Sequence, residues 1–122
     1  MTLRLIVFLL CFLLASAAGA GEVSVVKAEA RYQGHDKFTF SVTLRHADTG
    51  WKHYADKWQV IDADGRVLGT RVLMHPHVNE QPFTRSLSGV SIPAGINRVL
   101  VRASDTKHGE SSKTLAVDLP KR

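Results

Sequence analysis

An alternation of apolar and polar residues with a period of two constrains this chain most, because it recurs through nearly everything after residue 20. In "KFTFSVTLRH" (residues 37–46) every second side chain is apolar, and "VVKAEARYQ" (residues 25–33) alternates in the same way, with Val26 in its apolar series. Successive side chains of a β-strand point to opposite faces, so these segments predict strands with one buried face. No segment after residue 20 sustains a helical period. The sequence therefore predicts an all-β fold.

Turn signals between the apolar runs set the number of strands. Asp64-Gly65 joins "KWQVID" to "RVLGTRVLM", and Asp-Gly between apolar runs is typical of a β-hairpin. "FTRSLSGVSI", "RVLVRAS" and "KTLAVDL" follow, separated by "PAGIN" and by the loop "DTKHGES". Seven short strands in a chain of this length are typical of an immunoglobulin-like or fibronectin-like β-sandwich. We therefore expect a seven-stranded antiparallel sandwich with Trp58 in its core.

The first twenty residues have a different character. Residues 1–20 combine Arg4, an apolar run and a small-residue tail that ends in Ala18-Gly19-Ala20. This is the arrangement of a secretory signal peptide, and the apolar run is shorter than the ~20 residues of a membrane-spanning helix. We expect cleavage after Ala20. Residues 21–122 would then form one domain, periplasmic or secreted, with no membrane anchor.

The chain's only cysteine, Cys11, lies inside the apolar run of this leader. It follows Leu10, whereas a lipoprotein signal has a small residue before its cysteine, so we do not expect lipid attachment. Cleavage after Ala20 would remove Cys11. The exported domain would then contain no disulfide and no cysteine-ligated metal.

Composition and motifs exclude several classes of function. Lys and Arg number 16 against 11 Asp and Glu, which gives a formal net charge of +5. These basic residues are scattered along the predicted strands, which favours a solubilising surface over nucleic-acid binding. The sequence contains no nucleophile elbow, no usefully spaced carboxylate pair and no glycine-rich phosphate loop. We therefore expect a binding protein rather than an enzyme.

Histidines concentrate at one predicted end of the sandwich. Consecutive antiparallel strands alternate in direction, so every second loop lies at the same end. Five of the six histidines lie in or beside the second, fourth and sixth loops, whereas His35 lies in the first. We predict that these five form a metal site: His46, His53, His75, His77 and His108.

Strand parity adds detail to this set. His46 continues the inward series of residues 38–44, so its ring should point between the sheets, where each ring nitrogen needs a partner. A metal ion satisfies one nitrogen while a carbonyl or carboxylate orients the other; the alternative is a histidine hydrogen-bonded within its loop. His75 and His77 are two residues apart in an extended segment, so both rings can face one ion. The same period turns Met74 the opposite way, toward the core.

Two segments resemble the superoxide reductases of the desulfoferrodoxin and neelaredoxin type. "HYADKWQVIDADG" (residues 53–65) is similar to that family's stretch in which a ligand histidine and an aromatic residue lead into a strand ending at Asp-Gly. "DTKHG" (residues 105–109) resembles its Cys-x-x-His-Gly segment, with Asp105 in the place of the ligand cysteine. The family's domain is an immunoglobulin-like sandwich that holds one iron with four histidine nitrogens and one cysteine sulfur. The resemblance implies that His53 and His108 are ligands, with His46 as a candidate third.

Three functions follow from these observations. The first is an exported β-sandwich that binds a transition metal ion through loop histidines, as a carrier or a redox site. An all-imidazole set suits copper, zinc, nickel or iron, and the general order of affinities favours copper. The second is a metal-free immunoglobulin-like module that presents its loops or an edge strand to a periplasmic partner protein. The third, which the resemblance implies, is an iron-dependent oxidoreductase of the superoxide reductase type.

Overall fold

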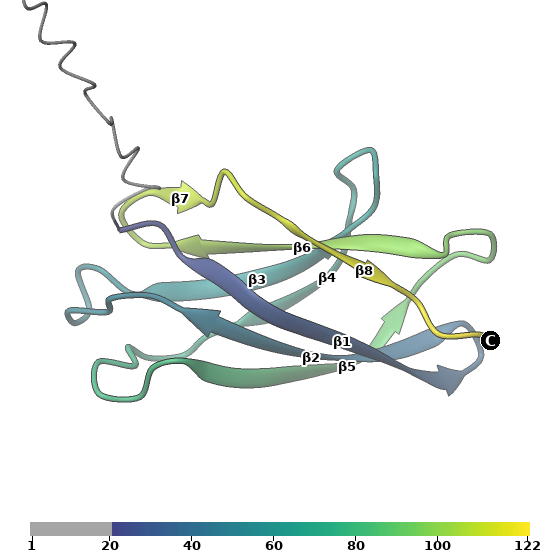
Figure 1. Ribbon diagram of the computed structural model, residues 1–122, viewed down its shortest axis with the longest axis horizontal. Coiled ribbons are helices and arrows are strands. Elements are labelled where there is room, and N and C mark those ends of the chain that lie inside the picture. The colour runs from purple at the N-terminus through teal and green to yellow at the C-terminus, as the bar shows by residue number, and fades with distance from the viewer. Residues whose placement is uncertain (1–20) are drawn as a thin grey trace, which may run out of the picture.

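Eight β-strands form two antiparallel sheets in the computed structural model, which describes residues 21–122 (Figure 1). The predicted signal peptide, residues 1–20, lies outside the described residues. The strands are β1 (Ser24–Gly34), β2 (Lys37–Arg45), β3 (Ala55–Ile61), β4 (Val67–Val72), β5 (Phe83–Ser91), β6 (Arg98–Asp105), β7 (Gly109–Glu110) and β8 (Leu115–Asp118). Within the described range, no helix has the length and apolarity needed to cross a lipid bilayer.

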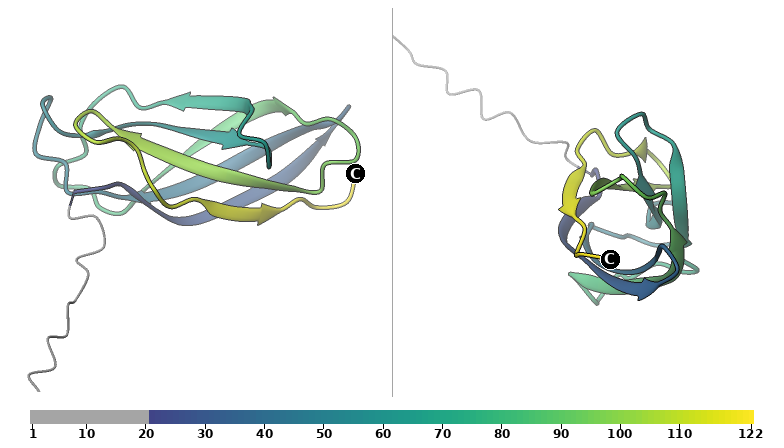
Figure 2. Two further views of the ribbon diagram at one scale, coloured as in Figure 1. Left: turned by 90° about the horizontal axis from the view of Figure 1, so that it is seen from above. Right: turned by 90° about the vertical axis from the view of Figure 1, so that its right-hand side faces the viewer.

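The two sheets pack face to face. One has the order β1-β2-β5, and the other has the order β4-β3-β6, with β7 and β8 both pairing with β6 on the side away from β3. Viewed along the long axis, the strands wrap around a common interior (Figure 2). The predicted all-β sandwich is confirmed, but seven was the wrong number of strands. Gly109, with φ +72°, turns the chain back so that it pairs with Asp105 and starts the short extra strand β7.

The core lies between the sheets and follows the predicted alternation most closely in β2. The four apolar residues of that strand are completely buried, and so is Trp58 of β3, as expected. Burial of a large aromatic side chain removes on the order of 150–250 Å² from water and contributes strongly to stability. The four buried residues of β2 are Phe38, Phe40, Val42 and Leu44.

The alternation fails at Val26 and at Met74, each time for a local reason. Val26 is 47% exposed because a bulge shifts the register between Val25 and Lys27, so Val25 packs on the core in its place. Met74 is 75% exposed, which contradicts its predicted inward direction. The strand β4 has already ended, and the preceding residue, Leu73, is buried and donates its N–H to the carbonyl of Asp56 at 2.8 Å.

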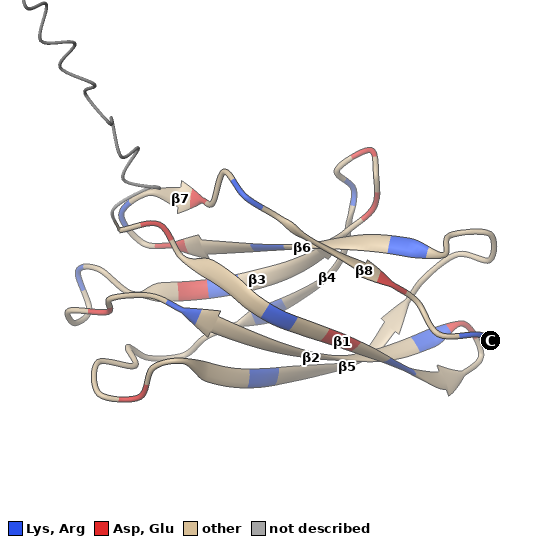
Figure 3. Cartoon of the chain, in the orientation of Figure 1, with Lys and Arg blue, Asp and Glu red and all other residues tan. Residues whose placement is uncertain are grey.

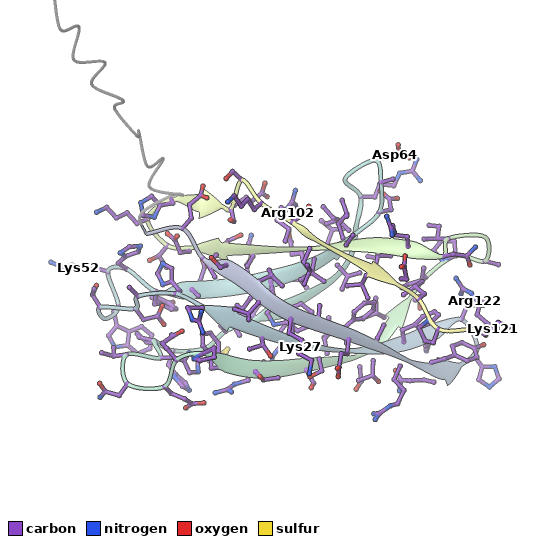
Figure 4. All side chains as sticks on the ribbon, in the orientation of Figure 1. Lys27, Lys52, Asp64, Arg102, Lys121 and Arg122 are labelled. Carbon is purple, nitrogen blue, oxygen red and sulfur yellow. The ribbon has the colours of Figure 1, made fainter. Side chains whose placement is uncertain are left out.

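The two ends of the sandwich carry different loops. The β2–β3, β4–β5 and β6–β7 connections lie together at one end, on the left of Figure 1, and the β1–β2, β3–β4 and β5–β6 connections lie at the other. Figure 4 shows Lys52 projecting at the first end and Lys121 and Arg122 at the second. Acidic and basic residues are interspersed along both sheets (Figure 3). The predicted sharing of an end by alternate loops is confirmed, with His35 in the β1–β2 turn at the far end.

Candidate metal centre

His46 follows directly after β2, and its side chain is completely buried. Its ring points between the sheets, as the parity of β2 predicts. Nδ1 contacts the carboxylate of Asp48. Nε2 lies 2.8 Å from the carbonyl oxygen of Gly21 and 3.4 Å from Oδ2 of Asp105. Both ring nitrogens therefore face oxygen atoms that accept hydrogen bonds or bind cations.

Asp48 holds His46 in place and is itself fixed by backbone groups. Its side chain is completely buried. Oδ1 accepts the N–H of Ala55 at 3.0 Å, and Oδ2 accepts the N–H of His77 at 2.7 Å. Because these donors come from β3 and from the β4–β5 loop, the carboxylate has a single defined orientation. A carboxylate fixed on one nitrogen of a histidine is the usual companion of a metal bound at the other nitrogen.

Asp105, the last residue of β6, supplies a second buried carboxylate. Its Oδ1 accepts the N–H groups of Lys107 at 2.8 Å and His108 at 2.6 Å, and Nδ1 of His108 lies 3.1 Å from both oxygens. Burial raises the pKa of Asp105, but the N–H groups of His108 and Lys107 and the His108 ring outweigh it and hold this pKa below its usual value. Asp105 is therefore a carboxylate anion at neutral pH.

His53, in the β2–β3 loop, places its ring between two other histidines. The ring centroids lie 4.7 Å from His46 and 5.0 Å from His108. A tight turn fixes its backbone, since its N–H donates to the carbonyl of Gly50 at 3.1 Å. Its Nε2 is buried, lies 3.6 Å from Oδ1 of Asp105, and makes no hydrogen bond to any residue in the described range. Buried polar atoms normally have a hydrogen-bond partner, so this unpartnered nitrogen is a candidate ligand atom for a metal ion.

Three of these side chains have the spacing that one metal ion requires. Within residues 21–122, ligand atoms of His46, His53 and Asp105 all lie within 4.8 Å of one another. Two ligands at ~2.1 Å from a tetrahedral ion are about 3.4 Å apart. Nε2 of His46 lies 3.4 Å from Oδ2 of Asp105 and Nε2 of His53 lies 3.6 Å from its Oδ1, so each nitrogen is close to that spacing from one oxygen of the carboxylate. The residues present therefore fit a metal ion with two imidazoles and one carboxylate.

His75 and His77 form a second pair in the β4–β5 loop, with ring centroids 4.6 Å apart. His77 is buried and stacks on Phe83, with centroids 3.9 Å apart and rings 8° from parallel. Its Nε2 accepts a hydrogen bond from Arg85 at 2.8 Å. Burial and then the charge of Arg85 lower the pKa of His77, so its ring is neutral at pH 7. Nδ1 of the exposed His75 lies 3.1 Å from the carbonyl oxygen of Pro76.

The predicted histidines thus divide into two groups at one end of the molecule. The structure brings His46, His53 and His108 together, and joins His75 and His77 to them through the contact between Asp48 and the backbone of His77. The membership of His75 and His77 in a metal site stays a prediction.

The predicted set of histidines included neither Asp105, the carboxylate that is a candidate ligand, nor Asp48, the carboxylate that orients His46. A signal for Asp105 was present, because it occupies the place of the ligand cysteine in the segment that resembles superoxide reductases. The spacing His46-x-Asp48 was the signal for the other, since side chains two residues apart in extended chain point to the same side.

Comparison with known proteins gives a curated relative that aligns with most of this chain. A protein of Halomicrobium mukohataei named "Putative lipoprotein" is 41% identical over 97 residues, which cover 80% of this chain and 47% of that protein. The chain therefore spans about half the length of this curated relative. No family model matches the chain, and no solved structure matches it.

Proposed function

We propose that the protein is an exported, immunoglobulin-like β-sandwich that binds a transition metal ion through His46, His53 and Asp105, as a carrier or a redox site. The observation that carries this proposal is Nε2 of His53, which is buried without a partner among the described residues and lies 3.6 Å from a carboxylate. An unsatisfied buried polar atom costs about 1–3 kcal/mol. A cation shared with Asp105 removes that cost.

The hydrogen-bond partners of His46 and His53 can be compared with and without a bound metal ion. Without a metal, both ring nitrogens of His46 face only oxygen acceptors, from Asp48 at Nδ1 and from Gly21 and Asp105 at Nε2. With a metal, Nε2 is the ligand and Nδ1–H donates to Asp48. The first arrangement leaves Nε2 of His53 unsatisfied. In the second that nitrogen is also a ligand, while Nε2 of His46 gives up its hydrogen bond to the carbonyl of Gly21. This difference favours the metal.

The donor set limits the choice of metal. Two imidazoles and a carboxylate suit Cu(II), Zn(II) and Fe(II), and the general order of affinities places copper first. Asp105 stands where the superoxide reductases have a thiolate, and a carboxylate donates less electron density to iron than a thiolate does. We therefore propose metal binding at the place that the resemblance indicates, without superoxide reduction.

The name of the Halomicrobium relative contains the word "lipoprotein", which supports a location outside the cytoplasm. The leader allows two kinds of processing, namely cleavage after Ala20 or lipid attachment at Cys11. We propose cleavage after Ala20, because the small residues at positions 18–20 match a signal-peptidase site and Leu10 does not match a lipoprotein signal.

Exposed apolar side chains favour a second candidate function, that of an interaction module. Trp51 is 68% exposed in the β2–β3 loop, and Met74 and Val78 are 75% and 51% exposed in the β4–β5 loop. Exposed apolar residues gathered on neighbouring loops are typical of protein-binding surfaces. A folded, exported chain that binds no metal would leave this function standing.

The test is a metal titration of the exported protein, purified without a histidine tag. We expect one Cu(II) or Zn(II) per chain at micromolar affinity or tighter, with about 2.7 kcal/mol of stabilisation at an excess of 100 times Kd. His53→Ala should abolish this binding. The matched control is His35→Asn at the far end, since asparagine tolerates the positive φ of 53°. Unchanged affinity in His53→Ala, or no binding by the wild type, would overturn the proposal.

A further inference from the structure

Backbone atoms of Gly21 lie inside the histidine group. The carbonyl oxygen of Gly21 is 2.8 Å from Nε2 of His46. A Cβ at this position would lie 2.7 Å from Cε1 of His108 and 3.5 Å from Cε1 of His53, so the Cα of Gly21 already packs against these rings. Its φ of +102° also favours glycine. Close approach and backbone conformation therefore both require glycine here.

The residues that follow hold this segment in place. The Glu22 carboxylate accepts the hydroxyl of Ser112 at 2.9 Å and its N–H at 3.3 Å. Val23 is 1% exposed and belongs to the core. In Figure 1 the described chain begins beside the β6–β7 connection, which carries His108. The position of Gly21 at the metal centre is therefore set by contacts outside the centre itself.

Cleavage of the leader would change the chemistry of Gly21. Hydrolysis of the peptide bond after Ala20 adds water, so that Ala20 leaves with a carboxylate and the nitrogen of Gly21 becomes a primary amine. A peptide nitrogen carries a hydrogen and acts only as a donor, whereas a free amine has a lone pair that binds metal ions. This nitrogen is one bond, ~1.46 Å, from the Cα that packs against the ring of His108.

We propose that the α-amino nitrogen of Gly21, released by cleavage after Ala20, is a ligand of the metal ion at His46, His53 and Asp105. This inference rests on the proposed function. Three side-chain ligands leave a tetrahedral ion one ligand short, and the amine supplies the fourth. Removal of the leader therefore completes the site, so the precursor binds the metal more weakly than the exported protein does.

The test compares two exported proteins that differ by one residue at the amino terminus. The first is produced from the full precursor, and intact mass should show a chain that begins at Gly21. The second carries one additional alanine before Gly21, made with a leader that is cleaved one residue earlier. Competition with a chelator should give a Cu(II) affinity at least 10-fold lower for the extended chain. His35→Asn, made in the first protein, is the matched control and should retain full affinity.

A spectroscopic measurement separates ligation from a structural role. The protein is produced with ¹⁵N-glycine, and pulsed electron paramagnetic resonance is recorded on its Cu(II) complex. We expect a directly coordinated ¹⁵N nucleus in the processed chain and none in the extended chain. Glycine packing alone would produce no such signal.

The outcomes distinguish this inference from the function on which it rests. Equal affinity of the two proteins, both sensitive to His53→Ala, would overturn the role of the amine and leave the metal centre intact. A processed chain that begins elsewhere than at Gly21 would do the same. An absence of Cu(II) binding by both proteins would overturn the metal centre as well.

Discussion

The two histidine groups at one end of this molecule have opposite electrostatic surroundings. His46 and His53 face the buried carboxylates of Asp48 and Asp105, and one ring nitrogen of His53 makes no hydrogen bond within residues 21–122. In the second group, Nε2 of His77 accepts a hydrogen bond from the guanidinium of Arg85. The carboxylates around the first group favour a bound cation, and Nε2 of His53 is the nitrogen without a hydrogen-bond partner beside them. In the second group the charge of Arg85 opposes a cation beside His77, whose Nε2 is already used, although Nδ1 of His77 is also buried without a partner in the described range.

The difference teaches that histidine clustering alone does not define a metal centre. Both groups contain rings less than about 5 Å apart, with centroids at 4.7 Å in one and 4.6 Å in the other. The charge of the neighbouring side chain separates them, because an adjacent carboxylate favours a bound cation and an adjacent guanidinium opposes it.

The largest expected effect comes from neutralising the carboxylate of the first group. Asp105→Asn keeps an oxygen that accepts the N–H groups of Lys107 and His108, but it removes the charge. We expect metal affinity to fall by at least ~100-fold, the upper end of the loss seen for residues that only orient ligands. Competition with a coloured chelator measures this. An affinity within about threefold of the wild type would remove the electrostatic distinction between the groups.

The next effect tests the carboxylate that joins the two groups. Asp48→Asn should lower metal affinity by roughly 10–100-fold, because His46 loses the anion that orients it. It should also lower the free energy of unfolding by about 1–3 kcal/mol, because an amide has one acceptor oxygen and leaves the N–H of either Ala55 or His77 without its acceptor. Chelator competition and urea unfolding give the two quantities. A loss of stability with unchanged affinity would make Asp48 purely structural.

A smaller effect concerns the pH dependence of stability in the second group. Burial, Arg85 and His75 lower the pKa of His77, against opposing contributions from Glu80 and Asp48. Below about pH 6.5 the unfolded chain therefore binds a proton that the folded chain does not, so stability falls as the pH decreases toward the folded pKa.

The variant His77→Phe isolates this contribution, because it keeps an aromatic ring to stack on Phe83. Urea unfolding at about pH 5.5 and 7.5 should show a smaller loss of stability on acidification in the variant than in the wild type. Its metal affinity should stay within about threefold of the wild type. An identical pH dependence in the two proteins, or a large loss of affinity, would contradict the separation of the two groups.

The smallest effect is expected from His75, which is exposed and whose Nδ1 lies 3.1 Å from the carbonyl oxygen of the neighbouring Pro76. His75→Ala should change the free energy of unfolding by less than ~0.5 kcal/mol, as surface substitutions usually do. Metal affinity should be unchanged in the same chelator assay. A clear loss would support the membership of His75 in the predicted five-histidine site.

Much of the fold was predictable because strand parity is a local property of the sequence. The buried series of β2, the buried Trp58 and the inward ring of His46 all follow from a period of two. The parity failed where the backbone stops being a regular strand, at the bulge beside Val26 and beyond the end of β4 at Met74. Neither event leaves a distinct pattern in the residues themselves.

The candidate site was predictable to the level of one end of the molecule. Strand order places five histidines there, but which rings meet depends on loop conformation. The stacking of His77 on Phe83 and the turn that brings Asp105 toward His53 are set by tertiary packing. A search for histidine ligands alone also left out Asp105, although its position in the 105–109 segment indicated it.

The position of a bound ion is the most direct test of a metal centre at His46, His53 and Asp105. Crystals of the exported protein grown with Zn(II) and measured on both sides of the zinc absorption edge locate the ion by its anomalous scattering. We predict one peak with Nε2 of His46, Nε2 of His53 and an oxygen of Asp105 at about 2.0–2.2 Å. A peak held by His75 and His77, or no peak at zinc concentrations well above micromolar, would contradict it.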